Sequence, residues 1–214
     1  MKKRDVILAA FGIFLFWQIS ALIVNRNILP SPLVVVPIFF RELLNGNMLS
    51  HALASLWRVV ASMFLSVALA APTGLALGQS KRFNRFFSPV IYLLYPIPKV
   101  VLIPIILLFF GIGDLPKIII IFMILFFQIL VLVRDQAAAL PTELIQSVRS
   151  LGAGRRALFR FVYLPASLPA ILTALRQSVG TAVAVLYITE TFATQRGLGY
   201  YIFLNASTLF DYPT

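Results

Sequence analysis

Long runs without charge constrain this chain more than any other feature. Residues 6–24 include no charged side chain over 19 positions, and a helix needs about 20 apolar residues to cross the hydrocarbon core of a bilayer. Further apolar stretches lie at about residues 59–78, 88–110, 116–133 and 169–192. The chain is 60% hydrophobic and 12% charged, whereas a soluble domain is roughly half apolar and a quarter charged. We therefore expect an all-α polytopic membrane protein with five transmembrane helices.

The first apolar run follows basic residues, as the core of a signal peptide also does. Such a core is about 7–15 residues long and precedes a cleavage site of small residues. Here the run is longer, and Asn25, Arg26 and Asn27 follow it. The sequence favours a retained transmembrane helix, and a cleaved signal peptide is the alternative.

Basic residues lie between the apolar runs and set the expected orientation. With the N-terminus inside, eleven of the 18 basic residues fall on inner segments and five on outer segments, as the positive-inside rule requires. The inner basic residues are Lys2, Lys3, Arg4, Lys81, Arg82, Arg85, Arg134, Arg149, Arg155, Arg156 and Arg160. The formal charge of +11 therefore points to membrane topology and anionic lipid, and no nucleic-acid partner is expected.

Two loops carry most of the residues outside the expected spans. The outer loop, about residues 25–55, opens with "LPSPLVVVP", which its prolines predict to be extended, and continues with one or two amphipathic surface helices. The inner loop covers about residues 135–168. Five spans with an inside N-terminus place the C-terminus outside, so we expect the chain to lack a sixth, C-terminal span.

Four prolines lie in or at the start of the third apolar run: Pro89, Pro96, Pro98 and Pro104. A proline inside a helix removes a backbone hydrogen bond and kinks or breaks the helix. Broken helices occur at membrane depth where they face protein or a water-filled cavity. The sequence therefore allows a broken span beside a pathway or a kinked packing helix.

The fourth span is expected to begin within "FFGIGDLPK". The glycines predict a turn, Asp114 is placed to cap the helix, and Pro116 falls in its first turn. Further along the span, Gln128 either forms a packing hydrogen bond or contacts a solute.

Polar side chains at bilayer depth are costly and usually face protein or a cavity. Lys99 either attracts an anionic solute or pairs with a structural carbonyl or carboxylate. Thr173, Gln177 and Thr181 form a small, polar stripe that either packs against a helix or lines a pathway. Glu190, near the outer end of the fifth span, is expected to reach water, with a gating role as the alternative. The pathway candidates are Pro96, Pro98, Lys99, Gln128, Thr173, Gln177, Thr181 and Glu190.

A basic, glycine-rich segment, "SVRSLGAGRRALFRFVYLP", interrupts the apolar runs at residues 147–165. A short helix is expected to lead into it, with Thr142 as its N-cap. Gly152 supplies the left-handed conformation that ends helices, and Gly154 can cap the next helix. That second helix is expected to stop at Pro165. The pattern predicts a helix, a glycine hinge and a helix along the inner membrane face.

This segment resembles the inner loop of the permeases of binding-protein-dependent ABC importers, which is written E-A-A-x3-G-x9-I-x-L-P. At the same spacing this chain has Gln146-Ser147-Val148, then Gly152, Val162, Leu164 and Pro165. The glycine, leucine and proline match, valine replaces isoleucine, and Gln-Ser-Val replaces the acidic opening. Four further stretches are similar to the nitrate/sulfonate/taurine branch of these permeases: "SLWRVVASMFLSVALAAPTGLALG", "SPVIYLLYPIPKVVLIPIILLFFGIGDLPKI", "LPASLPAILTALRQSVGTA" and "GLGYYI".

The resemblance implies that residues 1–214 form a single transmembrane permease domain that is not itself an enzyme. ATP hydrolysis, with its ATP and Mg²⁺, would belong to separate cytoplasmic ATPase subunits, and this chain would bind no cofactor. Residues 142–165 would form the coupling loop toward that ATPase. Its candidate residues are Glu143, Gln146, Ser150, Leu151, Gly152, Ala153, Gly154, Arg155, Leu164 and Pro165.

The same resemblance implies a second permease copy as a homodimer partner and a periplasmic or lipid-anchored solute-binding protein. The chain would span the bacterial cytoplasmic membrane several times, with its N-terminus in the cytoplasm. The solute would be a small anion such as nitrate, a sulfonate or taurine. The alternative is a membrane scaffold or assembly subunit that does not transport.

A membrane-embedded enzyme is the third class of function to weigh. The chain has one histidine, His51, and no cysteine, which excludes disulfides and a multi-histidine metal site within one chain. It also lacks the H-E-x-x-H and G-x-S-x-G motifs. The sequence therefore offers no catalytic set at membrane depth.

Overall fold

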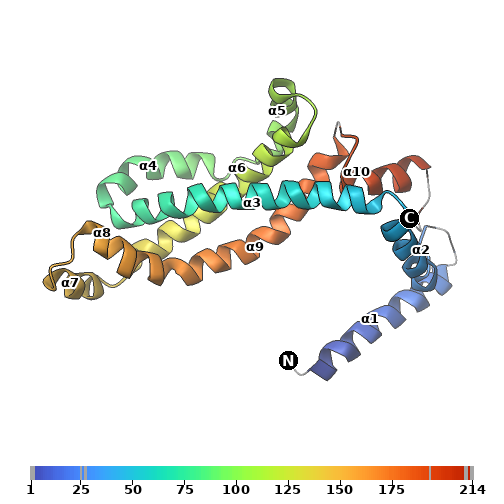
Figure 1. The fold of residues 1–214 in the computed structure, drawn as a ribbon, viewed down its shortest axis with the longest axis horizontal. Coiled ribbons are helices and arrows are strands. Elements are labelled where there is room, and N and C mark those ends of the chain that lie inside the picture. The colour runs from blue at the N-terminus through green and yellow to red at the C-terminus, as the bar shows by residue number, and fades with distance from the viewer. Residues whose placement is uncertain (1–2, 25, 27, 193, 210–211, 213–214) are drawn as a thin grey trace. The chain divides into compact units, whose positions relative to one another are not determined.

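Helices with short connections make up the chain in the computed structural model, which describes residues 3–24, 26, 28–192, 194–209 and 212 (Figure 1). Within that described part there is no strand, and the predicted all-α fold is confirmed. The helices are α1 (Lys3–Val24), α2 (Pro32–Asn45), α3 (Met48–Gln79), α4 (Lys81–Leu94), a 3₁₀ turn (Lys99–Leu102), α5 (Ile103–Phe110), α6 (Asp114–Ala138), α7 (Thr142–Ser150), α8 (Arg155–Leu158), a π-helical turn (Phe159–Tyr163), α9 (Leu164–Thr191), α10 (Leu198–Phe203) and a second π-helical turn (Leu204–Leu209). The chain divides into two units. The first consists of residues 1–55 and 190–214, and the second consists of residues 56–189.

Among the residues that the structure describes, four helices are long and apolar enough to cross a membrane. They are α1, α3, α6 and the continuous helix Arg155–Thr191, which joins α8 to α9. Helix α4 and the segment Lys99–Phe110 form a further pair that is bent by 73°. The number of spans reaches the predicted five when this bent pair is taken as one broken span. The prolines of the third run therefore do break a helix, as their positions predict.

In the second unit, α3 packs against α6 through small side chains. These residues recur at every fourth position and share one face of the helix: Ser62, Ser66, Ala70, Gly74 and Gly78. Ser62 Oγ lies 3.3 Å from the carbonyl oxygen of Ile118, and Ser66 Oγ lies 3.3 Å from that of Phe122. The contacts advance by four residues on both helices, so α3 and α6 run parallel. The chain must recross the membrane between them, and α4 and α5 provide that crossing.

Gly74 and Gly78 bring the two backbones into close approach. A Cβ atom on Gly78 would lie 2.6 Å from the Ala137 Cβ and 2.6 Å from the Arg134 carbonyl oxygen. A Cβ atom on Gly74 would lie 2.9 Å from the Leu130 carbonyl oxygen. The G-x-x-x-G spacing therefore serves close helix packing.

An ion pair closes one end of the same interface. The buried Arg58 donates through Nε to Asp114 at 2.8 Å and places Nη2 2.6 Å from the same carboxylate oxygen. The sequence predicts Asp114 as the cap of α6, and that prediction is wrong because Gly113 is the N-cap and no side chain caps the helix. Asp114 instead turns its carboxylate to the guanidinium group. Pro116 lies in the first turn, as predicted.

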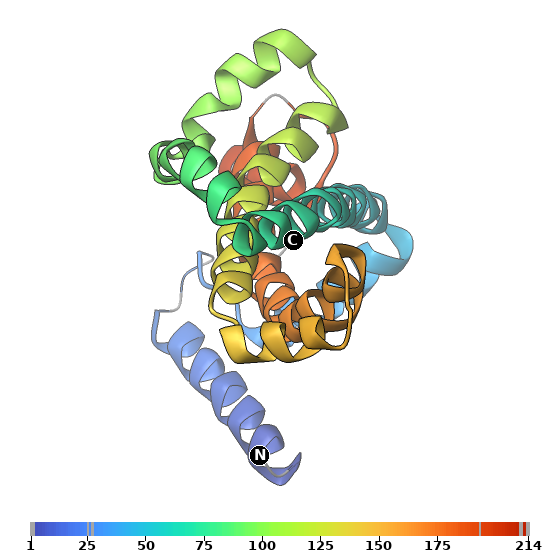
Figure 2. The ribbon, with the colours of Figure 1, turned by 90° about the vertical axis from the view of Figure 1, so that its left-hand side faces the viewer.

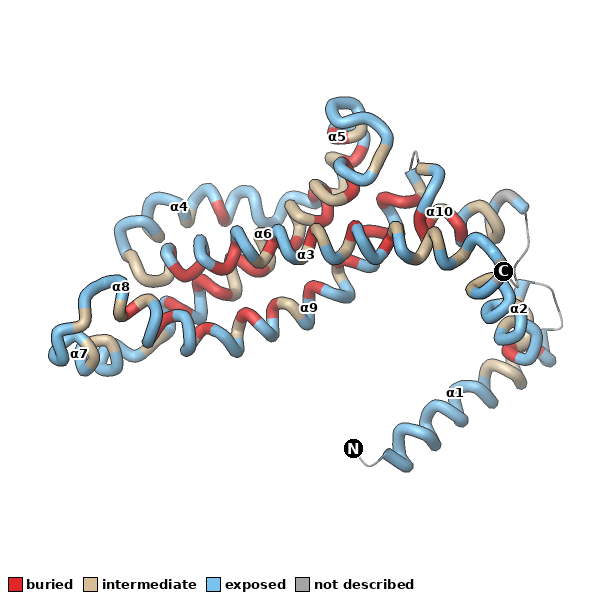
Figure 3. The backbone as a smooth tube through the Cα atoms, viewed as in Figure 1, coloured by how far each residue is buried: buried red, intermediate tan, exposed pale blue. Residues whose placement is uncertain are grey.

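The core of the second unit lies where α3, α6 and α9 face one another. Figure 3 shows buried positions along these three helices, and Figure 2 shows them running together. Ile121, Leu125, Ile129 and Val133 of α6 are all fully buried. Large apolar side chains on the outward faces of the same helices are exposed, as expected where lipid is the solvent.

In the first unit, α2 corrects the prediction of an extended segment at "LPSPLVVVP". The helix begins at Pro32 and includes Pro37. Pro32 occupies the first turn, where a backbone N–H has no partner within the helix. The N–H groups of Val34 and Val35 both bond to the carbonyl of Ser31, at 2.9 and 3.0 Å. The proline therefore starts a helix here.

Helix α3 also extends further than the sequence predicts. The sequence predicts one or two surface helices at residues 38–58, but the part from Met48 onward continues without a break into the span and makes one helix of 32 residues. Helix α1, by contrast, exposes nearly all of its side chains. Within the first unit, the indole Nε1 of Trp17 donates to the carbonyl of Pro30 at 3.2 Å and ties the end of α1 to the turn before α2.

Candidate functional site

The hinge segment, defined as residues 142–165, begins with α7. The sequence predicts Thr142 as the N-cap, but Pro141 holds that position with φ −56° and ψ 133°. The carbonyl of Pro141 accepts the N–H of Ile145 at 3.5 Å. The prediction is therefore wrong by one residue, because the ring of Pro141 already fixes its φ. The Thr142 hydroxyl donates to the Glu143 carboxylate at 3.2 Å instead.

Two glycines separate α7 from α8, and they differ in backbone conformation. Gly152 has a φ of +83°, and its N–H bonds to the carbonyl of Arg149 at 2.9 Å. A left-handed glycine is what ends α7, as predicted. Gly154 has a φ of −76° and is the N-cap of α8, also as predicted. Neither glycine has an atom within 4 Å of the position of an added Cβ, so conformation and not space sets the requirement at Gly152.

The hinge segment turns one side inward and leaves the other uncovered in the described chain. Ile145, Val148 and Ala153 pack against the core of the second unit. Leu151, beside the hinge, is 85% exposed. The other predicted coupling residues are exposed too: Glu143, Gln146, Ser150, Gly152, Gly154, Arg155, Leu164 and Pro165. A protruding turn with an apolar tip is suited to dock in a groove of another protein.

The second helix of the hinge segment does not stop at Pro165, which corrects the prediction. Residues 155–191 are helical throughout, with a π-helical turn at Phe159–Tyr163. The N–H of Leu164 bonds to the carbonyl of Phe159, five residues back. This wider turn shifts the carbonyls that the ring of Pro165 would otherwise meet. The inner loop therefore leads directly into the last long span.

A cavity of about 390 Å³ lies beside the broken span in the second unit. Its lining includes Pro98, Lys99, Gln128 and Val185. The structure therefore brings three of the pathway candidates together, although they were predicted from two separate spans. The side-chain amide of Gln128 has no hydrogen-bond partner among the residues described, so it is available to a small polar molecule in the cavity.

Lys99 holds the break in the span. Its Nζ donates to the carbonyls of Leu94, Tyr95 and Ile97 at 2.8, 2.9 and 3.2 Å. It also lies 4.6 Å from the centre of the Phe127 ring. Carbonyls at the end of a helix lack helical partners, and the ammonium group supplies a donor to these three; the Leu94 carbonyl also accepts the N–H of Ile97 at 3.4 Å. The geometry supports the structural alternative for Lys99, and a contact with solute stays a prediction.

The other pathway candidates of the second unit are not among the residues that line this cavity. Thr173 and Gln177 are exposed on α9, and Thr181 is half-buried. The Thr173 hydroxyl bonds back to the carbonyl of Pro169 at 2.8 Å. Pro96 lies in the turn between α4 and the 3₁₀ turn. The stripe on α9 is therefore directed away from its own core and open to lipid, to a pathway or to a second copy.

Glu190 is fully buried in the first unit, so the prediction that it reaches water is wrong. Ser55 Oγ donates to both carboxylate oxygens, at 2.8 and 2.9 Å, and the N–H of Gly199 donates at 2.8 Å. Hydrogen bonds from a hydroxyl and a backbone N–H compensate a buried carboxylate for lost water. A gating role for Glu190 stays a prediction.

The same cluster organises the start of α10. The N–H of Leu198 bonds to Ser55 Oγ at 2.8 Å, and the N–H of Gly197 bonds to His51 Nδ1 at 3.0 Å. Gly197 has a φ of +136°, and a Cβ there would collide with the Glu190 carboxyl group. Sequence reasoning missed this cluster because Ser55 and Glu190 are 135 residues apart. The repeated glycines of "RGLGYY" are the only local signal.

No group of three or more histidine, cysteine, aspartate or glutamate side chains that could hold a metal ion occurs in the described part of the chain. The polar side chains among the described residues that line the cavity are the amide of Gln128, the phenol of Tyr95 and the ammonium group of Lys99, which is already bonded to carbonyls. This arrangement can bind and guide a small polar solute, and it offers no nucleophile paired with a base.

Comparison with known proteins agrees with this arrangement. A family profile described as "Binding-protein-dependent transport system inner membrane component" matches residues 65–214. The chain is 30% identical over 193 residues to the taurine transport system permease protein TauC of Escherichia coli (strain K12), a match that covers 87% of this chain and 70% of TauC. It is also 30% identical over 191 residues to the putative aliphatic sulfonates transport permease protein SsuC of the same strain, covering 88% of this chain and 73% of SsuC.

A solved structure shares the fold. The chain is similar to a subunit in an inward-facing conformation of the MetNI methionine ABC transporter, with a TM-score of 0.68 and 21% sequence identity. That match covers 79% of this chain and 84% of the other.

Proposed function

The chain belongs to the family of inner-membrane components of binding-protein-dependent transport systems, and we propose that it forms the solute pathway of an ABC importer. In this proposal residues 1–214 act as one permease domain in the bacterial cytoplasmic membrane, with the N-terminus in the cytoplasm. The hinge segment couples the pathway to a separate ATPase subunit, which binds ATP and Mg²⁺. The observation that carries the coupling proposal is the left-handed Gly152 beside the exposed Leu151.

The coupling role is supported by how the hinge segment is held. Its inner side packs on the core through Ile145 and Val148, so a force on α7 reaches the spans. Its second helix continues through Pro165 into α9, which makes one continuous helix from the hinge to Thr191. A partner that moves the tip at Leu151 would therefore move α9 as well.

The pathway is proposed to use the cavity beside the broken span. Gln128 presents an amide to it, and Lys99 keeps the break in shape. The exposed stripe with Thr173, Gln177 and Thr181 on α9 is suited to face a second copy of the chain, because small residues allow helices to approach closely. Two copies would enclose a pathway that one chain leaves open.

A small anion of the sulfonate type is the proposed solute, delivered by a periplasmic or lipid-anchored binding protein. This choice rests on the names of TauC and SsuC, which are transport permeases for taurine and for aliphatic sulfonates. The chain itself is proposed to bind no cofactor.

The test is reconstitution in proteoliposomes with the cognate ATPase subunit and solute-binding protein. Taurine or an alkanesulfonate, with its binding protein, is expected to stimulate ATP hydrolysis. Leu151→Asp should abolish copurification of the ATPase, because it places a charge on the exposed apolar tip. Ile112→Asp is the matched control, since Ile112 is 72% exposed in the turn at the other end of α6. Copurification without any solute stimulation would contradict a transport role and favour the scaffold.

A further inference from the structure

A second cavity, of about 570 Å³, lies in the second unit where α3 ends and α4 begins. The described residues that line it are rich in hydrogen-bond donors and include no acidic residue. The polar residues that line it are Gln79, Ser80, Arg82, Arg149, Arg155 and Tyr163. These come from α3, α4, α7, α8 and the π-helical turn, so the cavity joins the hinge segment to the first helices of the unit.

Three arginines line this cavity, and no carboxylate is among its described lining residues. None of the three takes part in the ion pairs of Arg41, Arg58 and Arg134. Like charges in one cavity repel each other, and an anion would turn that repulsion into attraction. The side-chain Nε2 of Gln79 adds a buried donor with no partner among the described residues. The donor set matches a phosphate group, whose oxygens accept several hydrogen bonds from arginine.

An apolar groove of about 620 Å³ continues from this cavity between α3, α4 and α6. Ala76 and Phe83 line both spaces. The groove extends along α4 from Phe83 to Leu94, which at the rise of a helix is about 16 Å. That length is close to half of a hydrocarbon core about 30 Å thick, so it suits one acyl chain of a single leaflet.

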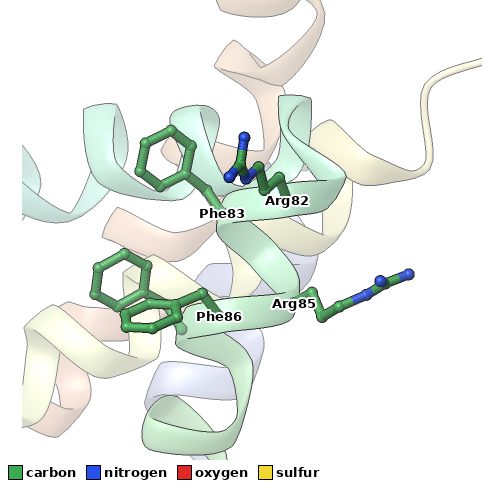
Figure 4. Close-up of a pocket in the computed structure, with 5 residues that line it drawn as sticks. Arg82, Phe83, Arg85 and Phe86 are labelled. Carbon is green, nitrogen blue, oxygen red and sulfur yellow. The ribbon is translucent and has the colours of Figure 1, made fainter.

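The surrounding surface places this site at the level of lipid headgroups. The first turns of α4 expose Phe83, Phe86 and Phe87 beside Arg82 and Arg85. Figure 4 shows the phenyl rings on one side of the helix and the Arg85 side chain pointing the other way. Aromatic rings with neighbouring arginines are typical of a membrane interface, where the charged ends reach the headgroups.

We infer that the cavity and groove together bind one anionic phospholipid. Arg82, Arg149 and Arg155 hold its phosphate, Gln79 donates a further hydrogen bond, and an acyl chain lies in the groove past Phe83. Arg149 and Arg155 stand on the two sides of Gly152. The bound phosphate therefore links the two helices of the hinge segment to α4, and the lipid sets the resting angle of the hinge.

Native mass spectrometry of the full chain, purified from membranes in detergent, tests this site. The chain is titrated with phosphatidylglycerol, with phosphatidylcholine and with inorganic phosphate. Phosphatidylglycerol should bind at least about tenfold more tightly than phosphatidylcholine, and Arg82→Gln, Arg149→Gln or Arg155→Gln should each weaken it about tenfold. Arg160→Gln is the control, because Arg160 lies on the same segment but outside the cavity lining, and it should leave binding unchanged.

Ala76→Phe separates a lipid from a free phosphate. The larger side chain fills the junction of the cavity and the groove. It should therefore weaken the binding of phosphatidylglycerol and leave the binding of inorganic phosphate unaffected. Equal losses in Arg160→Gln and the cavity variants would show diffuse attraction and overturn the site. Equal binding of the two phospholipids would also overturn it. Binding of inorganic phosphate without competition from phosphatidylglycerol would assign the arginines to a free anion and contradict the lipid.

Discussion

Glycine serves opposite purposes at the α3–α6 interface and in the hinge segment. Gly78 of α3 is in a regular helix, and any side chain would meet the backbone of α6 at 2.6 Å. Gly152 has open space around it, but its φ of +83° is one that other residues rarely adopt. The first glycine allows two helices to touch, and the second allows the chain to turn. The interface thus holds the spans together, while the hinge sets the direction of an exposed tip.

Gly78→Leu should have the largest effect on the fold. The side chain has to displace the backbone of α6, so we expect a loss of about 3 kcal/mol in unfolding free energy. Thermal unfolding in detergent measures it. Gly12→Leu is the control, because an added Cβ at Gly12 in α1 has no atom within 4 Å. An unchanged midpoint in Gly78→Leu would mean that α3 and α6 do not pack as described.

Gly152→Val should remove coupling and keep the fold. A β-branched residue in the left-handed region costs about 1–2 kcal/mol, which the exposed hinge relieves by changing its angle. We expect solute-stimulated ATP hydrolysis to fall to the unstimulated rate with little change in thermal midpoint. Gly154→Val is the matched control, since Gly154 has equal space and a φ of −76°, and it should retain most of the stimulation. Similar losses in both variants would show that the conformation of Gly152 is not what matters.

Lys99→Met tests the break between α4 and the 3₁₀ turn, where the ammonium group donates hydrogen bonds to backbone carbonyls. It removes the ammonium donor from three carbonyls at and just after the end of α4, of which, among the residues described, only that of Leu94 keeps a backbone N–H, that of Ile97 at 3.4 Å. We therefore expect a loss of about 2 kcal/mol in unfolding free energy. Gln128→Leu, in the same cavity, should instead raise the KM for solute uptake and leave the thermal midpoint unchanged. A raised KM with an unchanged thermal midpoint in Lys99→Met would show that the ammonium group binds solute and does not stabilise the break in the helix.

Ser62→Ala should have the smallest effect. Ser62 Oγ lies 2.6 Å from the carbonyl of Arg58 on its own helix and 3.3 Å from that of Ile118 on α6. Because the shorter contact lies within α3, the loss in unfolding free energy, measured by thermal unfolding, should stay below about 1 kcal/mol. A loss as large as that of Gly78→Leu would mean that hydrogen bonds, rather than close backbone packing, hold α3 to α6.

Features encoded by nearby residues could be predicted from the sequence. Pro96 and Pro98 predict the break after Leu94, and a glycine after a short helix predicts the turn at Gly152. The apolar runs give the spans, because about 20 residues must satisfy their backbone within one segment. The extent of the helices is predicted less well. The sequence favours extended chain at Pro32 and a helix end at Pro165, whereas Pro32 begins α2 and Pro165 lies inside a helix.

Features that pair distant residues could not be predicted in the same way. Arg58 and Asp114 are 56 residues apart, and Ser55 and Glu190 are 135 apart. Their partners follow only once the order of helices is fixed. Glu190 was expected in water because a carboxylate near the end of a span usually reaches it, and the donors of Ser55 and Gly199 reverse that expectation. The small residues at every fourth position of α3 were a usable signal for its contact with α6.

The central claim is that the tip of the hinge segment docks on an ATPase, and cysteine crosslinking tests it most directly. The chain has no cysteine, so Leu151→Cys introduces a single reactive thiol at the tip, and Ile112→Cys introduces one in the turn at the other end of α6. In membranes that contain the assembled transporter, a short photoactivatable reagent on residue 151 is expected to form an adduct with the ATPase subunit, and the same reagent on residue 112 is expected to form none. Equal labelling from both positions, or an adduct from residue 112 alone, would contradict the account.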